Sequence, residues 1–383
     1  MRPTRIPKRY RTVEQRFVAG NRVELLRDGA EAYPAMLAAI RGAERQVLFE
    51  MYWFDSDRTG REFATALGEA AARGVEVAVI YDAVGSIGVS PGQFDEMARA
   101  GAKVILYNPL SPWAARFRLG RLTRRDHRKI LTVDGRIGFT GGINIADAWV
   151  ALDEQGGGGW RDDMVRVEGP AVKDMADCTR TIWRRSGGAP LQTSLPIAAA
   201  AGAMSVRTLC EGYPGKRQIS HEYVARIYRA RERIFIRNAY FVPDWPTRTA
   251  LRRAARRGVD VRILMPGQSD VEIVRHASRA TWGSLLRSGV KLFEWEPTIL
   301  HAKSAVIDGL WSTVGTYNFD YLSLRTNLEV NVAVEDAAFG AEMERSFELD
   351  LASSREVDRE SFRFRPLGER LFEWIAYRFR RLL

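Results

Sequence analysis

With 383 residues, 46% of them hydrophobic, the chain is long enough for two or three domains with large cores, and its two cysteines argue neither for a disulfide framework nor for a zinc cluster. The amino terminus lacks the apolar run of a signal peptide, and the most apolar charge-free stretch, 196–204, is too short to cross a bilayer. The net charge of +11 is concentrated in residues 1–27 (+6), 111–125 (+5) and 362–383 (+4), which favours docking on an anionic surface, although solvated segments that only aid solubility would give the same pattern.

Strand and helix patterns alternate through the first half. Residues 47–54 (VLFEMYWF) and 75–82 (VEVAVIYD) are continuous apolar runs, which are typical of buried central strands. Amphipathic patterns predict helices at 60–74 and 91–102, and a further strand follows at 103–108. This alternation indicates an α/β sheet with helices on both faces.

The first half leads into the stretch 127–144, HRKILTVDGRIGFTGGIN, which has the pattern H-x-K-x4-D. Residues two apart in an extended segment point to the same side, so the histidine and the lysine face one site. A single match to this pattern carries little weight. The residues of interest in this stretch are His127, Lys129, Asp134, Gly141, Gly142 and Asn144.

The same order of elements returns in the second half and leads into HAKSAVIDGLWSTVGTYN at 301–318. Two of the four histidines therefore occupy equivalent places in an internal repeat, which argues against two unrelated buried histidines. The repeat predicts two similar domains that share one site, at 21–190 and 205–355, with a carboxyl-terminal tail at 356–383. The residues of interest in the second stretch are His301, Lys303, Asp308, Gly315, Thr316 and Asn318.

These residues resemble the phospholipase D superfamily, whose signature is this duplicated motif. Segments such as FEMYWFDSDRTGRE, NAYFVPD and SLRTNLEVN are similar to its cardiolipin synthase branch, in particular the short bacterial type without amino-terminal membrane spans. The resemblance covers nearly the whole chain. It implies an α/β fold of two similar phospholipase D-like domains, each a mixed β-sheet flanked by helices, which form a pseudo-two-fold unit with the active site at their interface.

Phosphodiester transfer needs an in-line nucleophile, a proton donor and positive charge for the phosphoryl oxygens, and two imidazoles with two lysines supply these without a metal or other cofactor. The resemblance assigns His127 as the nucleophile and His301 as the general acid and later base, and the reverse order stays open. Lys129 and Lys303, together with the amides of Asn144 and Asn318, would bind the phosphate.

A reactive imidazole needs a carboxylate on its other nitrogen. The resemblance places such a residue about thirty positions after each motif, at Asp162 and Glu329, with Asp163 as the competing choice for the first. Asp134 and Asp308 are expected to brace their loops rather than touch substrate. Gly141, Gly142 and Gly315 allow close backbone approach, and Thr316 keeps the hydroxyl of the serine that the family usually has there.

The expected partners are an anionic phospholipid membrane and lipid substrates, with no nucleic acid and an open oligomeric state. The pattern of residues 367–383 predicts an amphipathic helix, which would lie in a membrane interface or pack on its own domain. Aromatic residues interleaved with arginines at 113–125 would contact the same membrane interface. The sequence thus predicts a cytoplasmic, peripheral phosphatidyltransferase that passes a phosphatidyl group from phosphatidylglycerol to a second lipid through a phosphohistidine. A hydrolytic phospholipase D and a metal-independent nuclease are the alternatives.

Overall fold

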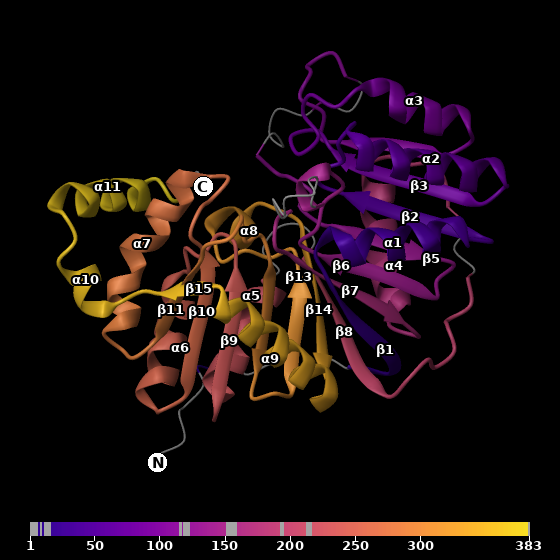
Figure 1. Ribbon diagram of the computed structural model, residues 1–383. Helices are drawn as coiled ribbons and strands as arrows, with labels where there is room; N and C mark the ends of the chain where they lie inside the picture. The colour runs from indigo at the N-terminus through magenta and orange to yellow at the C-terminus, as the bar shows by residue number, and fades with distance from the viewer. Residues whose placement is uncertain are drawn as a thin grey trace.

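The computed structural model describes residues 7, 10, 17–114, 117, 123–150, 159–191, 195–211 and 217–381. Two halves of similar architecture lie side by side (Figure 1). The first half contains β1 (Val18–Arg27), α1 (Asp28–Arg41), β2 (Gln46–Met51), α2 (Arg58–Ala72), β3 (Glu76–Asp82), α3 (Pro91–Arg99), β4 (Lys103–Tyr107), β5 (Ile130–Val133), β6 (Ile137–Gly141), the short 3₁₀ helix η3 (Asp147–Trp149), β7 (Asp163–Glu168) and α4 (Val172–Arg185).

The second half repeats this order and adds one strand and two helices at its end. It contains β8 (Met204–Glu211), α5 (Gln218–Arg229), β9 (Arg233–Asn238), α6 (Trp245–Arg256), β10 (Asp260–Pro266), α7 (Glu272–Leu286), β11 (Lys291–Trp295), β12 (Lys303–Ile307), β13 (Trp311–Gly315), α8 (Tyr321–Arg325), β14 (Glu329–Glu335), α9 (Ala337–Ala352), β15 (Ser354–Glu356), α10 (Arg359–Arg363) and α11 (Leu367–Arg378). None of the described helices combines the length and the apolar character needed to cross a bilayer.

The strands form one mixed sheet in the order β15-β11-β10-β9-β12-β13-β14-β8-β1-β7-β6-β5-β2-β3-β4. Apart from β15, this order reads as a palindrome about the β8–β1 contact, in which each strand of one half mirrors its counterpart in the other. The predicted α/β class with two similar halves is confirmed. The two sheets are not separate, however, because β1 and β8 pair antiparallel and join them edge to edge.

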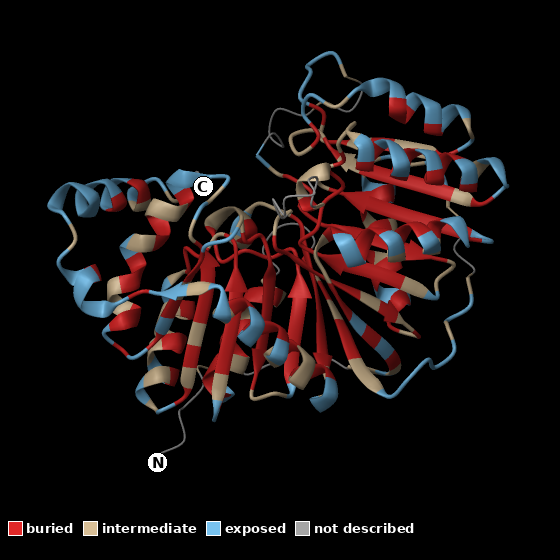
Figure 2. Ribbon diagram, in the orientation of Figure 1, coloured by how far each residue is buried: buried red, intermediate tan, exposed pale blue. Residues whose placement is uncertain are grey.

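The central strands are buried on both faces, as Figure 2 shows, which explains their unbroken apolar sequence. Each half has its own core on one face of the sheet. On the other face, α4 and α9 cover a core that both halves build together, with Val165 and Met175 from the first half and Val330 and Phe347 from the second.

The two motif aspartates form the hairpins that follow β5 and β12. Asp134 and Asp308 have φ of 53° and 54°, and the glycine after each is also positive in φ, as a two-residue type I′ turn requires. The Asp134 carboxylate accepts N–H bonds from Arg45 and Gln46 at 2.8 Å, and Asp308 accepts equivalent bonds from residues 231–233. Both aspartates lie at the opposite ends of these strands from the motif histidines.

A buried ion network ties the halves together beneath the site. Asp350 of α9 accepts hydrogen bonds from Arg161 (2.9 Å) and Arg237 (2.6 Å). Asp163 of β7 pairs with the same two arginines at 2.7 and 3.3 Å, and Arg27 reaches Asp350 at 2.8 Å. Two buried carboxylates, the two buried guanidinium groups of Arg161 and Arg237 and the partly exposed one of Arg27 therefore satisfy one another across the two halves. Arg27, which the sequence counted as surface charge, is part of this internal network.

Replacing Asp350 with asparagine should destabilise the protein by about 3–5 kcal/mol, because it leaves buried arginine charge uncompensated. Asp177→Asn provides a matched control, since that carboxylate is 47% exposed and its ion pair with Lys173 lies at the surface. The control should change stability by less than about 1 kcal/mol. Urea unfolding of both variants measures the difference, and equal stabilities would show that the network contributes little.

Candidate active site

The backbone at the start of each motif forms hydrogen bonds with the backbone of the opposite half. The His127 N–H donates to the carbonyl of Leu328, and Leu328 N–H donates to Arg125, at 3.1 and 2.9 Å. In the same way the His301 N–H donates to the Arg161 carbonyl at 2.7 Å, and the Arg161 N–H donates to Ile299. These hydrogen bonds hold Leu328 and Arg161 in place. The residue after each of them, Glu329 or Asp162, therefore lies beside the histidine of the other half.

Each imidazole is consequently held by a carboxylate from the other half. Nδ1 of His127 lies 3.0 Å from Oε2 of Glu329, and Nδ1 of His301 lies 2.7 Å from Oδ2 of Asp162. Both pairs are buried. The competing choice, Asp163, instead belongs to the arginine network below the site. Each carboxylate is fixed on Nδ1, so Nε2 of each ring is left for a substrate.

The two carboxylates are themselves held differently. Glu329 accepts hydrogen bonds from the hydroxyls of Ser323, at 2.7 Å, and Thr316. Asp162 accepts one from the indole of Trp149 at 3.0 Å. Gly142 stands where the second half has Thr316, and a Cβ built on it would lie 2.1 Å from the Asp162 carboxylate. The glycine therefore makes room for Asp162, whereas the threonine supplies a donor to Glu329.

The motif lysines are buried and aimed into the same region. The Nζ atoms of Lys129 and Lys303 donate back to the carbonyls of the motif histidines, the first at 2.8 Å. Within the described chain neither ammonium group forms an ion pair with a carboxylate, so both charges are available to an anion. No group of three or more histidine, cysteine or acidic side chains among these residues has the arrangement of a metal site.

The motif asparagines lie just after β6 and β13, at the same end of the sheet. The side-chain oxygen of Asn144 accepts the N–H of Trp53 at 3.1 Å. The side-chain oxygen of Asn318 is buried and has no hydrogen-bond partner within the described residues. Gly141 and Gly315, just before them, face backbone of the neighbouring strand at less than 3 Å from a built Cβ, so the strands approach closely there.

Two tyrosines that the sequence did not single out flank the site symmetrically. Tyr52 packs edge-on against His127 at 4.8 Å between ring centroids, with the Lys129 ammonium 5.1 Å from its ring. Tyr240 has the same relation to His301 and Lys303, at 6.3 and 6.0 Å. Each tyrosine follows the equivalent strand of its half, β2 or β9, so alignment of the internal repeat was the signal that could have found them.

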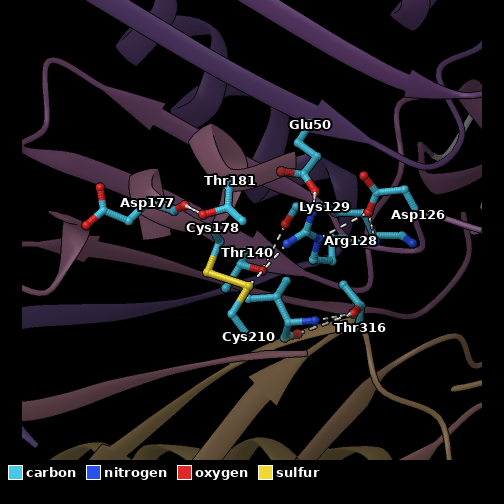
Figure 3. The surroundings of a disulfide bond; sticks show 11 residues. Glu50, Asp126, Arg128, Lys129, Thr140, Asp177, Cys178, Thr181, Cys210 and Thr316 are labelled. Carbon is cyan, nitrogen blue, oxygen red and sulfur yellow. Dashed lines mark hydrogen bonds and ion pairs between the residues drawn. A yellow bond between two sulfur atoms is a disulfide. The ribbon is translucent and has the colours of Figure 1, made fainter. Parts of the chain in front are cut away.

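Arg128, between His127 and Lys129, lies among Glu50, Asp126 and Cys210 (Figure 3). It forms ion pairs with Glu50 and Asp126, and its guanidinium lies 3.1 Å from Sγ of Cys210. Cys210 of β8 is joined to Cys178 of α4 in a disulfide between the halves, with Cα atoms 6.3 Å apart. The number of cysteines alone did not predict this pairing, which follows from the packing of α4 across the sheet.

The family model "Cardiolipin synthase, PLD-like domain" matches residues 36–155 and 223–351. The chain belongs to this family. The cardiolipin synthase of Geobacillus kaustophilus is 33% identical over 372 residues, which cover 96% of this chain and 73% of that protein. Cardiolipin synthase A of Pseudomonas fluorescens is 34% identical over 364 residues, with 94% and 75% covered. The resemblance seen in the sequence is thereby confirmed.

A phosphatidylserine synthase from Haemophilus influenzae has a similar solved structure, with a TM-score of 0.70 at 13% identity. The match covers 96% of this chain and 95% of that one, so the two proteins share their fold over nearly their whole length.

Burial sets the protonation states of the histidines and lysines in this site of a cardiolipin synthase family member. Burial lowers the pKa of His127 to about 4, against the opposing charge of Glu329. Burial and the charge of Lys303 also lower the pKa of His301. The pKa of Lys129 falls to about 7 through burial and the nearby Lys303, and burial lowers that of Lys303 to about 8. At neutral pH the imidazoles are therefore neutral, and the two lysines lose their charge as pH rises through about 7–8.

Thr316→Val should lower kcat by about 10–100-fold, because a lost hydrogen bond to a buried charged group costs about 1–3 kcal/mol. Thr316→Ser is the matched control, since it keeps the hydroxyl that holds Glu329, and its kcat should stay close to that of the parent. Steady-state rates with melting temperatures check this. A serine variant as slow as the valine variant would assign the effect to packing.

The lowered lysine pKa values predict an alkaline limit to substrate capture. A lysine with a lowered pKa is charged below that pKa and neutral above it, so kcat/KM should fall as pH rises through about 7–8, whereas an ordinary lysine stays charged to about pH 10. Profiles of kcat/KM on a short-chain soluble phosphodiester measure this, because that substrate does not itself titrate in this range. A flat profile from pH 6.5 to 9.5 would contradict it.

Proposed function

We propose that this phosphatidyltransferase moves a phosphatidyl group from phosphatidylglycerol to a second phosphatidylglycerol or a related lipid alcohol and releases glycerol. The reaction would proceed through a phosphohistidine without a metal ion, and the enzyme would act as a peripheral protein on the cytoplasmic face of an anionic membrane. The relatives named cardiolipin synthase support the substrate class.

The observation that carries this proposal is the pair of imidazoles, each anchored through Nδ1 to a carboxylate. A carboxylate on Nδ1 fixes the tautomer and stabilises an imidazolium. His127 and Glu329 form one such pair, and His301 and Asp162 the other. Two oriented imidazoles, with two buried ammonium groups that form no ion pair in the part of the chain that the structure describes, supply the nucleophile, the proton carrier and the charge that phosphoryl transfer needs.

In the first step Nε2 of His127 attacks phosphorus, a P–N bond forms, and the bond from phosphorus to the headgroup glycerol oxygen breaks. Protonated His301 gives its proton to that oxygen, and glycerol leaves. In the second step His301 takes the proton of the acceptor hydroxyl, whose oxygen attacks phosphorus while the P–N bond breaks. His127 is thereby regenerated, and cardiolipin is formed.

The electrostatics of the site suit this division of work. An imidazole with a pKa of about 4 is neutral and nucleophilic at neutral pH, as His127 must be. A general acid must instead carry a proton. Burial and the charge of Lys303 lower the pKa of His301, and an anionic phosphodiester beside Lys303 would offset that charge. Substrate binding would therefore favour the protonated form of His301.

Incubating the protein with phosphatidylglycerol vesicles should produce cardiolipin and glycerol, as identified by mass spectrometry. Phosphatidic acid in place of cardiolipin would indicate a hydrolytic phospholipase D. Unchanged lipid together with cleavage of an oligonucleotide would indicate a nuclease. His127→Ala should reduce turnover by about 10⁴-fold or more, because no covalent intermediate can form. His221→Ala, a histidine of α5 outside the site, should leave turnover unchanged.

The covalent intermediate distinguishes the roles of the two histidines. His301→Ala should slow turnover by about 10²–10⁴-fold, yet still accumulate a phosphatidyl adduct on His127 when the leaving group is good. Intact-protein and peptide mass spectrometry locates the adduct. An adduct on His301 and never on His127 would reverse the assignment.

A further inference from the structure

The last helix, α11, is turned with its apolar side away from the protein. Its buried residues are Glu373 and Ala376, whereas its large apolar side chains are 39–77% exposed. Figure 2 shows the helix exposed along most of its length. The outward face of α11 consists of Leu367, Leu371, Trp374, Ile375 and Phe379, while Phe372 borders it and packs edge-on against His276 of α7, with ring centroids 4.7 Å apart.

A charged contact holds α11 in this orientation. Glu373 is 1% exposed and pairs with Arg279 of α7 at 2.9 Å and with Arg365 at 2.6 Å. A helix stabilised by burial of its apolar side would have the opposite orientation. The helix therefore does pack on its own domain, as one alternative from the sequence held, but it uses its polar side to do so.

α11 also reaches the wall of the active site. Ala376 and Tyr377 pack in one cluster with Val242 of the loop after β9 and with Tyr240. Tyr240 lies against His301 and donates a hydrogen bond to Asp270 at 2.6 Å, in the loop after β10. The helix, these loops and the second half-site are thus in continuous contact.

Other exposed apolar side chains lie at this same end of the sheet. The histidines precede β5 and β12, which run antiparallel to β2 and β9, so the site lies at the carboxyl ends of the parallel strands. Loops and helix starts after those strands carry large apolar residues exposed to solvent, in both halves. They are Ile87 (73%), Trp113 (94%), Trp245 (65%) and Ile273 (42%).

The charge around α11 is mostly positive. Arg359, Arg363, Arg370 and Arg378 are exposed on α10 and α11, against exposed Glu360 and Glu369. A second copy of the chain seated on the outward face would place arginine against arginine. A bilayer surface of anionic phospholipid instead accepts both the apolar side chains and the cations.

We propose that the outward face of α11 inserts into the headgroup region of an anionic bilayer and that the exposed apolar residues around the active-site mouth make contact with the same surface. This inference rests on the proposed lipid substrate, because it orients the mouth toward the membrane that contains it. Part of the arginine-rich insert, residues 115, 116 and 118–122, lies outside the described residues, as do Leu382 and Leu383. Arg125 of that insert does not contribute, since it is buried and paired with Asp82.

The test uses the full chain with Leu371→Glu and Trp374→Glu together. Both side chains are 58% exposed, so the substitutions leave the buried contact of Glu373 intact. Leu310→Glu is the matched control, because Leu310 is 53% exposed in the hairpin at the far end of β12. Flotation with vesicles of phosphatidylglycerol and phosphatidylcholine measures binding, and melting temperature measures folding.

The double variant should bind these vesicles at least about tenfold more weakly, since it removes two large apolar contacts with the interface. It should turn over vesicle substrate correspondingly slowly while keeping the parent kcat on a soluble short-chain substrate, and Leu310→Glu should match the parent in each assay. Undiminished vesicle binding by the double variant would overturn the proposal. So would a parent dimer in solution that the double variant converts to monomer. Vesicle binding that depends on α11 without any cardiolipin formed would refute the proposed function and leave the docking intact.

Discussion

Each motif histidine depends on a carboxylate that the other half of the chain provides. This arrangement follows from two backbone hydrogen bonds between the halves, from His127 to Leu328 and from His301 to Arg161. They set the positions of the next residues, Glu329 and Asp162. The palindromic sheet makes both hydrogen bonds possible, because it brings β5 and β12 to equivalent positions about the β8–β1 contact. The site therefore exists only when the two halves keep one fixed arrangement.

The buried ions beneath the site serve that arrangement. An apolar interface of equal volume is often as stable as a buried ion network, so stability alone does not account for one here. Asp163 and Asp350 each bind the same two arginines, one from each half, and such directional contacts allow few alternative placements. Arg161 has a second task, since its backbone pairs with His301 while its guanidinium joins the network.

Much of the fold and of the candidate site could be predicted from the sequence, because the internal repeat encodes both. Continuous apolar runs locate the central strands and period-3.6 patterns the helices, and the duplicated motif implies two halves around one site. Pairing across the halves leaves no trace in a linear pattern, so nothing in the sequence assigned Asp162 to His301 rather than to His127. The orientation of α11 was equally hidden: a helical wheel shows an apolar side, but only the contact of Glu373 with Arg279 shows which side faces the protein.

The difference between Gly142 and Thr316 gives the halves separate identities. At Gly142 there is space for the shorter aspartate and an indole to hold it, whereas Thr316 offers a hydroxyl to the longer glutamate. Gly142→Thr would bring a side chain into collision with the Asp162 carboxylate, and Thr316→Gly would remove a hydrogen-bond donor to Glu329. The two half-sites are therefore equivalent in position but not interchangeable. A substitution at residue 142 or 316 acts on the histidine of the opposite half, because the carboxylate next to it holds that histidine.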